Sequence, residues 1–189
     1  MASIKVNTAG ELQMVERVTP RIYVACLASY NAGILHGRWI DCGHPDGVDH
    51  IESEVKAMLK ESTQHDAEEW AIHDHENMGG ISESESFERC ADIGYAVSDL
   101  RHLDSEALLH WLEYNPDGDI DDFEDAFYSV FTDKESFAQE VMCDRLDEAE
   151  KEWPQLSFYI DWEAVARDLL INDFYSVDGR NGVFIFRHL

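Results

Sequence analysis

Apolar residues recur at helical spacing within a strongly acidic stretch of the chain that runs from Asp104 to Glu150. Ile120, Phe123, Phe127 and Val130 are three or four residues apart, so a helix through them would carry one apolar stripe. The neighbouring carboxylates lie largely off that stripe: Asp121, Asp122, Glu124 and Asp125. The pattern predicts a folded helix that displays acid to solvent, and not a disordered acidic tail.

Helical signals also occur on both sides of this element. Residues 104–114 are predicted to form a helix before it. Thr132 to Glu135 has the form of a capping box and predicts another helix after it, ended by Pro154. Three residues of that helix are expected to face inward: Phe137, Val141 and Met142.

The chain before this stretch has mixed strand and helix patterns. Residues 21–27 and 35–41 are β-rich and bounded by turn residues, so they are predicted strands. Asp49 with Glu52 suggests the cap of a helix with three inward residues: Ile51, Val55 and Leu59. Residues 70–74 form a further strand candidate. A helix capped within Ser82–Glu85 is then expected to carry Phe87, Cys90, Ala91 and Val97.

The C-terminal segment predicts a short extended run, a helix and a hairpin. Residues 157–160 are expected to be extended, and Asp161 to cap a helix that buries Trp162, Val165, Ala166 and Leu169. The turn at 178–182 predicts a hairpin between residues 174–177 and 183–186.

The elements are short and mixed, without βαβ periodicity or internal repeats, which favours an α+β fold over a doubly wound sheet. We expect an elongated body of three small modules in series, with short antiparallel sheets and short helices. Residues 1–19 are predicted to be an N-terminal extension with a short helix around 11–18. The modules are then a ββα unit at 20–62, a mainly helical unit at 63–103 and an acidic α+β unit at 104–189.

Charge is the property of the composition that a globular fold does not explain. The 189 residues include 40 acidic and 14 basic side chains, a formal net charge of −26, beside an ordinary hydrophobic content of 44%. Such a surface repels nucleic acid and anionic membranes and attracts basic proteins or cations. Four scattered cysteines, no signal-peptide core and no run of transmembrane length predict a cytoplasmic protein.

Neither a metal site nor a catalytic motif is predicted. Residues 117–121 begin like a calcium loop, but the sixth and twelfth positions hold Asp122 and Tyr128 instead of Gly and Glu. The ligand spacing typical of a zinc site does not occur among His36, Cys42, His44, His50 and residues 73–75. The chain has no GxSxG, HExxH, phosphate loop or dinucleotide fingerprint. We therefore expect a protein that is not an enzyme and has no cofactor, and keep a metal-dependent enzyme as the weaker alternative.

The acidity has two plain explanations, which are solubility and adaptation to high salt. One local detail favours a specific use. Around 147–152 the predicted helix places acid at its C-terminal end, where the helix dipole disfavours each charge by about 0.3–1 kcal/mol. Charge placed against local stability is typical of functional surfaces.

A rigid array of carboxylates resembles the backbone of DNA. B-DNA carries one charge per ~1.7 Å of its axis. A dimer of this chain would carry −52, twice −26, which at DNA density equals the charge on roughly 88 Å of duplex. That magnitude suits occupation of a DNA-binding channel, with binding that weakens steeply as salt rises.

Several ordered blocks of sequence, between about residues 20 and 186, resemble the ArdA antirestriction family. They are 21–33 with 37–40, 68–76, 159–169 and 172–174. The resemblance implies an elongated, dimeric DNA mimic encoded on mobile elements, without catalytic residues, built of three small α+β modules with the dimer interface near the C-terminal one. It would occupy the DNA-binding groove of type I restriction–modification enzymes, at their methyltransferase and specificity core, and protect DNA that enters during conjugation.

We therefore expect acids along the 104–150 stretch to stand in for phosphates, helped by those of the central module, without direct binding to nucleic acid or membrane. The alternative is a general acidic sponge or chaperone for basic DNA-binding proteins. The predicted partner-binding residues are Asp104, Glu106, Glu113, Asp117, Asp119, Asp121, Asp122, Glu124, Asp125, Asp133, Glu135, Glu140, Asp144, Asp147 and Glu148.

Overall fold

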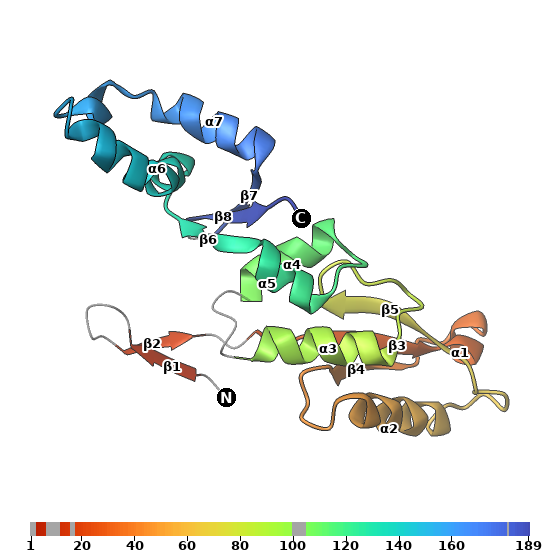
Figure 1. Cartoon of the computed structure of the whole chain (residues 1–189). Helices are drawn as coiled ribbons and strands as arrows, with labels where there is room; N and C mark the ends of the chain where they lie inside the picture. The colour runs from red at the N-terminus through yellow and green to blue at the C-terminus, as the bar shows by residue number, and fades with distance from the viewer. Residues whose placement is uncertain (1–2, 7–11, 16–17, 100–104, 181) are drawn as a thin grey trace. The chain divides into compact units, whose positions relative to one another are not determined.

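The structure is a computed structural model that describes residues 3–6, 12–15, 18–99, 105–180 and 182–189. Contacts within the chain divide it into two compact units, Met1–Ile120 and Asp121–Leu189. Each unit combines helices with a three-stranded antiparallel sheet (Figure 1), so the predicted α+β class is confirmed. The elongated shape and the module boundaries at 62 and 103 stay predictions.

The sheet of the first unit has β3 (Arg21–Cys26) at its centre, between β4 (Gly37–Asp41) and β5 (Trp70–Glu76). All three predicted strands are confirmed. The short helix α1 (Leu27–Asn31) occupies the start of the predicted turn between the first two. The pairing of β5 with the far edge of β3 was not predicted from sequence, because β5 follows a helix and a long connection.

Three longer helices complete the first unit: α2 (Gly47–Lys60), α3 (Phe87–Ser98) and α4 (Ser105–Tyr114). α2 packs on β3, β4 and α3. The ring of Phe87 on α3 stacks on the ring of Trp70 on β5, with the ring centroids 4.3 Å apart. The core between them contains Ile22, Ile40 and Ile51.

The helix caps of the first unit differ from the sequence predictions. The predicted cap Asp49 lies inside the first turn of α2, which follows Asp46. Met58 is buried on this helix, whereas the predicted Leu59 is half-buried. Ser86, and not the Ser82–Glu85 segment, caps α3 by accepting a hydrogen bond from the Arg89 amide at 3.1 Å. Neighbouring Ser, Asp and Glu residues are all competent caps, so sequence alone leaves the choice open by a few positions.

The second unit places β8 (Gly182–Arg187) between β6 (Phe127–Phe131) and β7 (Phe174–Gly179). The predicted hairpin is confirmed, although Asn181 of its turn lies outside the described residues. The predicted helical stripe through Phe127 and Val130 is wrong, because α5 (Ile120–Ala126) ends and β6 begins at Phe127. The aromatic run of β6 is a good strand, and pairing with β8 overrides its helical spacing.

The remaining elements of the second unit are α6 (Lys134–Glu150), the 3-10 helix η1 (Leu156–Tyr159) and α7 (Trp162–Asn172). α6 and α7 pack on each other. The helix predicted after Asp161 is confirmed, including its cap, which accepts from the Ala164 amide at 3.0 Å. The extended run predicted at 157–160 is wrong, because η1 occupies most of it. Phe137 is buried as predicted, whereas Val141 and Met142 are only half-buried.

The N-terminal segment forms an antiparallel pair of strands, β1 (Ser3–Val6) and β2 (Leu12–Val15). The helix predicted around 11–18 is therefore wrong for Leu12–Val15, whose backbone pairs with β1. Within the described part of the chain, no helix combines the length and the apolar character needed to cross a bilayer.

Polar contacts fix both ends of α6. At its start, Asp133 accepts hydrogen bonds from the amide and hydroxyl of Ser136 at 2.7 and 2.6 Å, so Asp133 is the cap in place of the predicted Thr132. Just past its end, the amide and hydroxyl of Ser157 donate to Glu150 at 3.0 and 2.8 Å. These hydrogen bonds hold the pKa of both carboxyls below their ordinary values.

Ionised Asp133 therefore stabilises the fold above its ordinary pKa of 3.8, and this contribution is lost as the pH falls through the lowered value. Asp133→Asn keeps an acceptor oxygen but does not titrate. We expect its unfolding free energy, measured by denaturant titration between about pH 2 and 6, to fall less steeply with acid than that of the wild type. Asp147→Asn on the same helix is the matched control. Equal slopes for Asp133→Asn and the wild type would contradict this role.

A close approach of two backbones explains Gly94 in the middle of α3. A Cβ atom there would lie 2.3 Å from the carbonyl carbon and oxygen of Cys42, in the segment after β4. We expect Gly94→Ala to lower the free energy of unfolding by about 1–3 kcal/mol, because backbone must move to admit the methyl group. Asp92→Ala, at an exposed position of the same helix, is the control and should cost far less. A fully stable Gly94→Ala protein would show that the two backbones can separate.

Candidate acidic interaction surface

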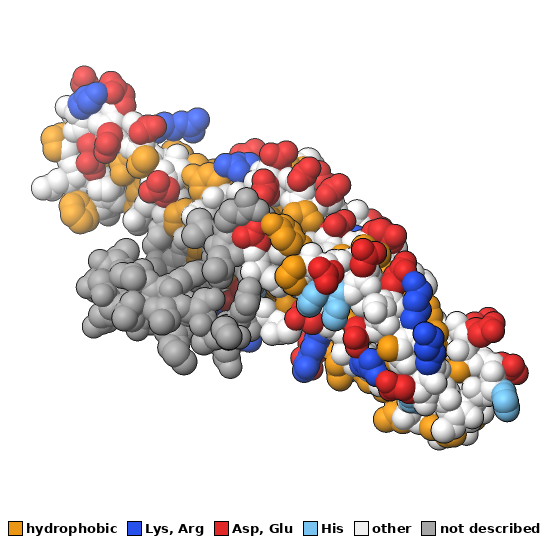
Figure 2. Space-filling model, turned by 90° about the horizontal axis from the view of Figure 1, so that it is seen from below, with side chains coloured by type: hydrophobic (Ala, Val, Ile, Leu, Met, Phe, Trp, Pro, Cys, Tyr) orange, Lys and Arg blue, Asp and Glu red, His pale blue; other side chains and the backbone are white. Residues whose placement is uncertain are grey.

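The predicted phosphate-mimicking acids fall on both units. Asp104 lies outside the described residues. The first unit carries Glu106, Glu113, Asp117 and Asp119, and the second carries the other ten. All of these are exposed except Glu106 and Glu135, which are half-buried. Figure 2 shows acidic side chains spread widely over the face in view, with fewer basic ones among them.

One face of α4 presents a line of titratable groups. Glu106 and Glu113 are seven residues apart, two helical turns, and His110 lies between them. The His110 ring nitrogens are 4.0 Å from a Glu106 oxygen and 3.3 Å from a Glu113 oxygen. The opposite face buries Leu108, Trp111 and Leu112, so the acids are held on a packed helix.

The turn after α4 is fixed by an arginine from α3. Arg89 donates from Nη2 to the carbonyl oxygens of Pro116 and Gly118, at 3.1 and 2.6 Å. The Trp111 ring packs so closely on Gly118 that a Cβ atom there would lie 2.3 Å from it. Asp117 and Asp119 are thereby presented from a constrained turn. Sequence reasoning missed Arg89, because nothing in the local pattern connects α3 with this turn.

α5 and α6 present the acids of the second unit. α5 buries Phe123 and Ala126, and its four acids are exposed. Two of them, Asp121 and Asp122, lie in the first turn, where the positive end of the helix dipole favours negative charge. α6 buries Phe137 and Ala138 near its start, whereas from Glu140 to Glu150 every side chain is exposed or half-buried. Glu140, Asp144 and Asp147 follow one another about one turn apart, or ~5.4 Å along the axis.

Several acids are partly neutralised within the chain. Glu148, a predicted partner residue, forms an ion pair with Lys151, which makes it a weaker candidate than its neighbours. Arg38 binds Glu54 and Glu61 of the first unit, each at 2.8 Å. Each unit nevertheless remains acidic, with formal charges of −15 for residues 1–120 and −11 for 121–189. α3 also exposes Glu88 and Asp92, which belong to the acids expected from the central region.

The described cysteines and histidines are also candidate metal ligands by residue type. No group of three or more His, Cys, Asp or Glu side chains in the described ranges could hold an ion. Burial raises the pKa of Cys42 far above its ordinary value and that of Cys90 to about 12, so both thiols stay protonated at neutral pH. His44 stacks on His50 with ring centroids 4.0 Å apart.

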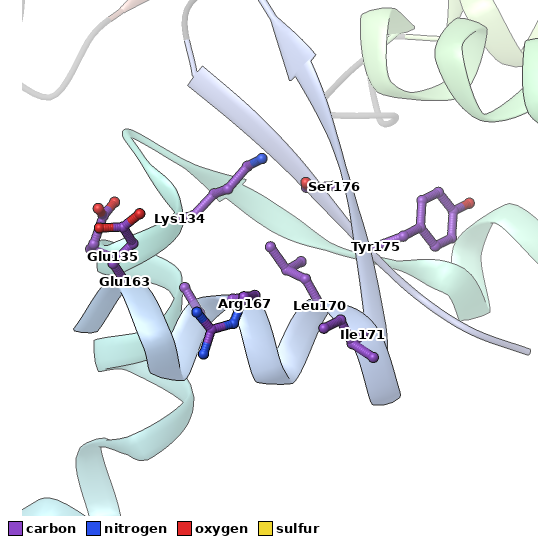
Figure 3. A pocket seen from close by; sticks show the side chains of 9 residues that line it. Lys134, Glu135, Glu163, Arg167, Leu170, Ile171, Tyr175 and Ser176 are labelled. Atoms are coloured by element: carbon purple, nitrogen blue, oxygen red, sulfur yellow. The ribbon is translucent and has the colours of Figure 1, made fainter. Parts of the chain in front are cut away.

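A shallow hollow of about 390 Å³ lies in the second unit between the start of α6, α7 and β7 (Figure 3). Glu135 and Glu163 lie together at one end, and Lys134 extends toward Ser176 of β7. Leu170 and Ile171 supply its apolar wall. The lining therefore combines both signs of charge with aliphatic carbon.

The family model described as "Antirestriction protein (ArdA)" matches residues 22–183. The match spans most of both units, including the acidic helices and the sheets that carry them. No curated protein matches the chain. The predicted resemblance is confirmed: the chain belongs to the ArdA family of antirestriction proteins.

Proposed function

We propose that this protein is an acidic DNA mimic that occupies the DNA-binding groove of type I restriction–modification enzymes. The observation that carries the proposal is the exposure of carboxylates on α4, α5 and α6, each helix anchored by its own buried residues, in a chain of the antirestriction family. Inhibition needs no chemistry at these groups, so the proposed action is not enzymatic.

Rigid presentation is what allows carboxylates to compete with phosphates. Groups that are already positioned lose little conformational freedom on binding. Release of counterions from the basic groove and from the acids favours the complex, as it favours binding of DNA. A single helical stripe has about one charge per ~5.4 Å, fewer than the one per ~3.4 Å of a DNA strand, so several helices must act together.

We further propose that the protein acts as a homodimer through the second unit. Trp153, Phe158 and Tyr159 are 64%, 82% and 77% exposed, and they lie in the connection that joins α6 to α7. Ile171, 69% exposed, lies at the C-terminal end of α7. Figure 2 shows apolar side chains at the part of the molecule that carries these helices. Exposed apolar clusters of this kind mark interfaces, and a two-fold dimer would match an enzyme that reads a split target.

A general sponge for basic proteins is the competing function. The sponge requires charge alone, whereas the mimic requires charge on particular faces. Comparing the affinities for a type I methyltransferase core and for an unrelated basic protein therefore distinguishes the two functions. We expect this protein to displace DNA from a type I methyltransferase core with an affinity that falls steeply between about 50 and 200 mM salt. The measurement is fluorescence competition with labelled duplex. Equal affinity for an unrelated basic protein, such as a histone-like factor, would favour the sponge.

Binding energy should be distributed over many carboxylates. Each exposed acid is expected to contribute about 0.2–1 kcal/mol, so Asp144→Asn alone should weaken competition only slightly. The triple change Glu140→Gln, Asp144→Asn and Asp147→Asn should weaken it by the summed amount. Its matched control neutralises three exposed acids outside residues 63–150, Asp49→Asn, Asp173→Asn and Asp178→Asn, and should weaken competition less. Loss of all inhibition on the single change, in a folded protein, would contradict the distributed picture.

The dimer is tested by removing its proposed apolar contacts. We expect Trp153→Ser with Phe158→Ser to shift the protein from dimer to monomer in sedimentation velocity, because both side chains would leave water on assembly. Tyr95→Ser, at a 61% exposed position on α3, is the control and should leave the mass unchanged. A monomeric wild type at micromolar concentration would overturn the dimer.

A further inference from the structure

One face of the first sheet carries a group of side chains that the acidic helices do not explain. Tyr23 lies opposite Trp39 on one side and Asp74 on the other, and Arg21 lies opposite Asp41 and Glu76. Directly opposed residues of antiparallel strands share a face. Six residues therefore define what we call the open sheet face: Arg21, Tyr23, Trp39, Asp41, Asp74 and Glu76.

The open sheet face is not the face that holds the fold together. The alternate residues Ile22, Val24 and Ile40 point to the other side and are buried there. On the open sheet face Trp39 is 36% exposed, and the side chains of Arg21 and Glu76 are 41% and 48% exposed. Asp41 and Asp74 are exposed as well.

Arg21 shows how this face holds a guanidinium group. Its Cζ atom lies 4.8 Å from the centre of the Trp39 ring, and its Nη2 atom is 2.7 Å from a Glu76 oxygen. The Trp39 and Tyr23 ring centroids are 5.5 Å apart. An aromatic face with a carboxylate beside it attracts a planar cation through both the ring quadrupole and the charge.

Further carboxylates flank the same rings and are already oriented. Asp41 accepts a hydrogen bond from the Gly43 amide at 2.8 Å, and Asp74 accepts one from the His75 amide at 2.8 Å. Gly37 makes room for the Tyr23 ring, since a Cβ atom there would lie 2.6 Å from it. With three acids and one arginine, the open sheet face has a formal charge of −2 and is complementary to a basic partner.

We propose that the open sheet face binds arginine side chains of the protein whose DNA-binding groove the acidic helices enter. The guanidinium would stack on the Tyr23–Trp39 pair and pair with Asp41 or Asp74, as arginine stacks on exposed bases of nucleic acid. Mimicry would then extend from phosphates to base faces. This inference rests on the proposed function for the identity of the partner, but not for the chemistry of the face.

The first experiment measures the affinity of each variant for a type I methyltransferase core, by competition with labelled duplex. Trp39→Ala should weaken binding by about 5- to 30-fold without changing the salt slope, because no ion pair is lost. Asp74→Asn should instead reduce the slope of log affinity against log salt concentration by about one released ion. The matched controls, Tyr95→Ala on α3 and Asp178→Asn at an exposed position of β7, should do neither. Thermal unfolding of each variant checks the fold, and Asp74→Asn removes no packing atoms.

A second probe does not depend on the proposed partner. Hexa-arginine and hexa-lysine peptides of equal charge are titrated into the wild type and Trp39→Ala at one salt concentration. We expect the wild type to prefer the arginine peptide and Trp39→Ala to lose that preference, because only a planar guanidinium stacks well. Equal preference in both proteins would overturn the inference. If the wild type failed to bind the methyltransferase yet kept this difference, the proposed function would fall and the arginine-binding face would stand.

Discussion

Mutual repulsion among carboxylates is the constraint on which the rest of this structure depends. A net charge of −26 opposes compaction, so each unit must bury enough apolar surface to offset it. The first unit buries Ile22, Ile40 and Ile51 between its sheet and helices, and the second packs Phe123 and Phe186 in its core. The acids remain on the solvent side of these elements, where water and salt screen their repulsion.

Several basic residues make contacts within the chain. Arg38 ties β4 to α2 through two glutamates, and Arg89 holds the turn that carries Asp117 and Asp119. Arg187 lies 4.8 Å over the Tyr128 ring and donates to the Asp125 carbonyl at 3.3 Å. Because these positive charges hold the acid-bearing segments in place, the surrounding surface stays negative. This division of labour suits a protein that presents fixed anions to a basic partner.

The two kinds of surface complement each other chemically. The acidic helices offer charge without directional selectivity, which favours attraction and rapid association. The open sheet face offers aromatic planes beside carboxylates, which distinguish an arginine from a lysine. Together they approach the composition of nucleic acid, in which anionic groups surround stacked rings.

Sequence by itself determined the α+β class, most strands, the acidic helices and the family, because these depend on local periodicity, charge and ordered motifs. It could not place β6, since the spacing of Phe127 and Val130 fits a helix as well as a strand until β8 supplies a pairing edge. Nor could it join Tyr23 to Trp39 and Asp74, or Arg89 to the acidic turn. These contacts link residues far apart in the chain, so tertiary structure alone decided them.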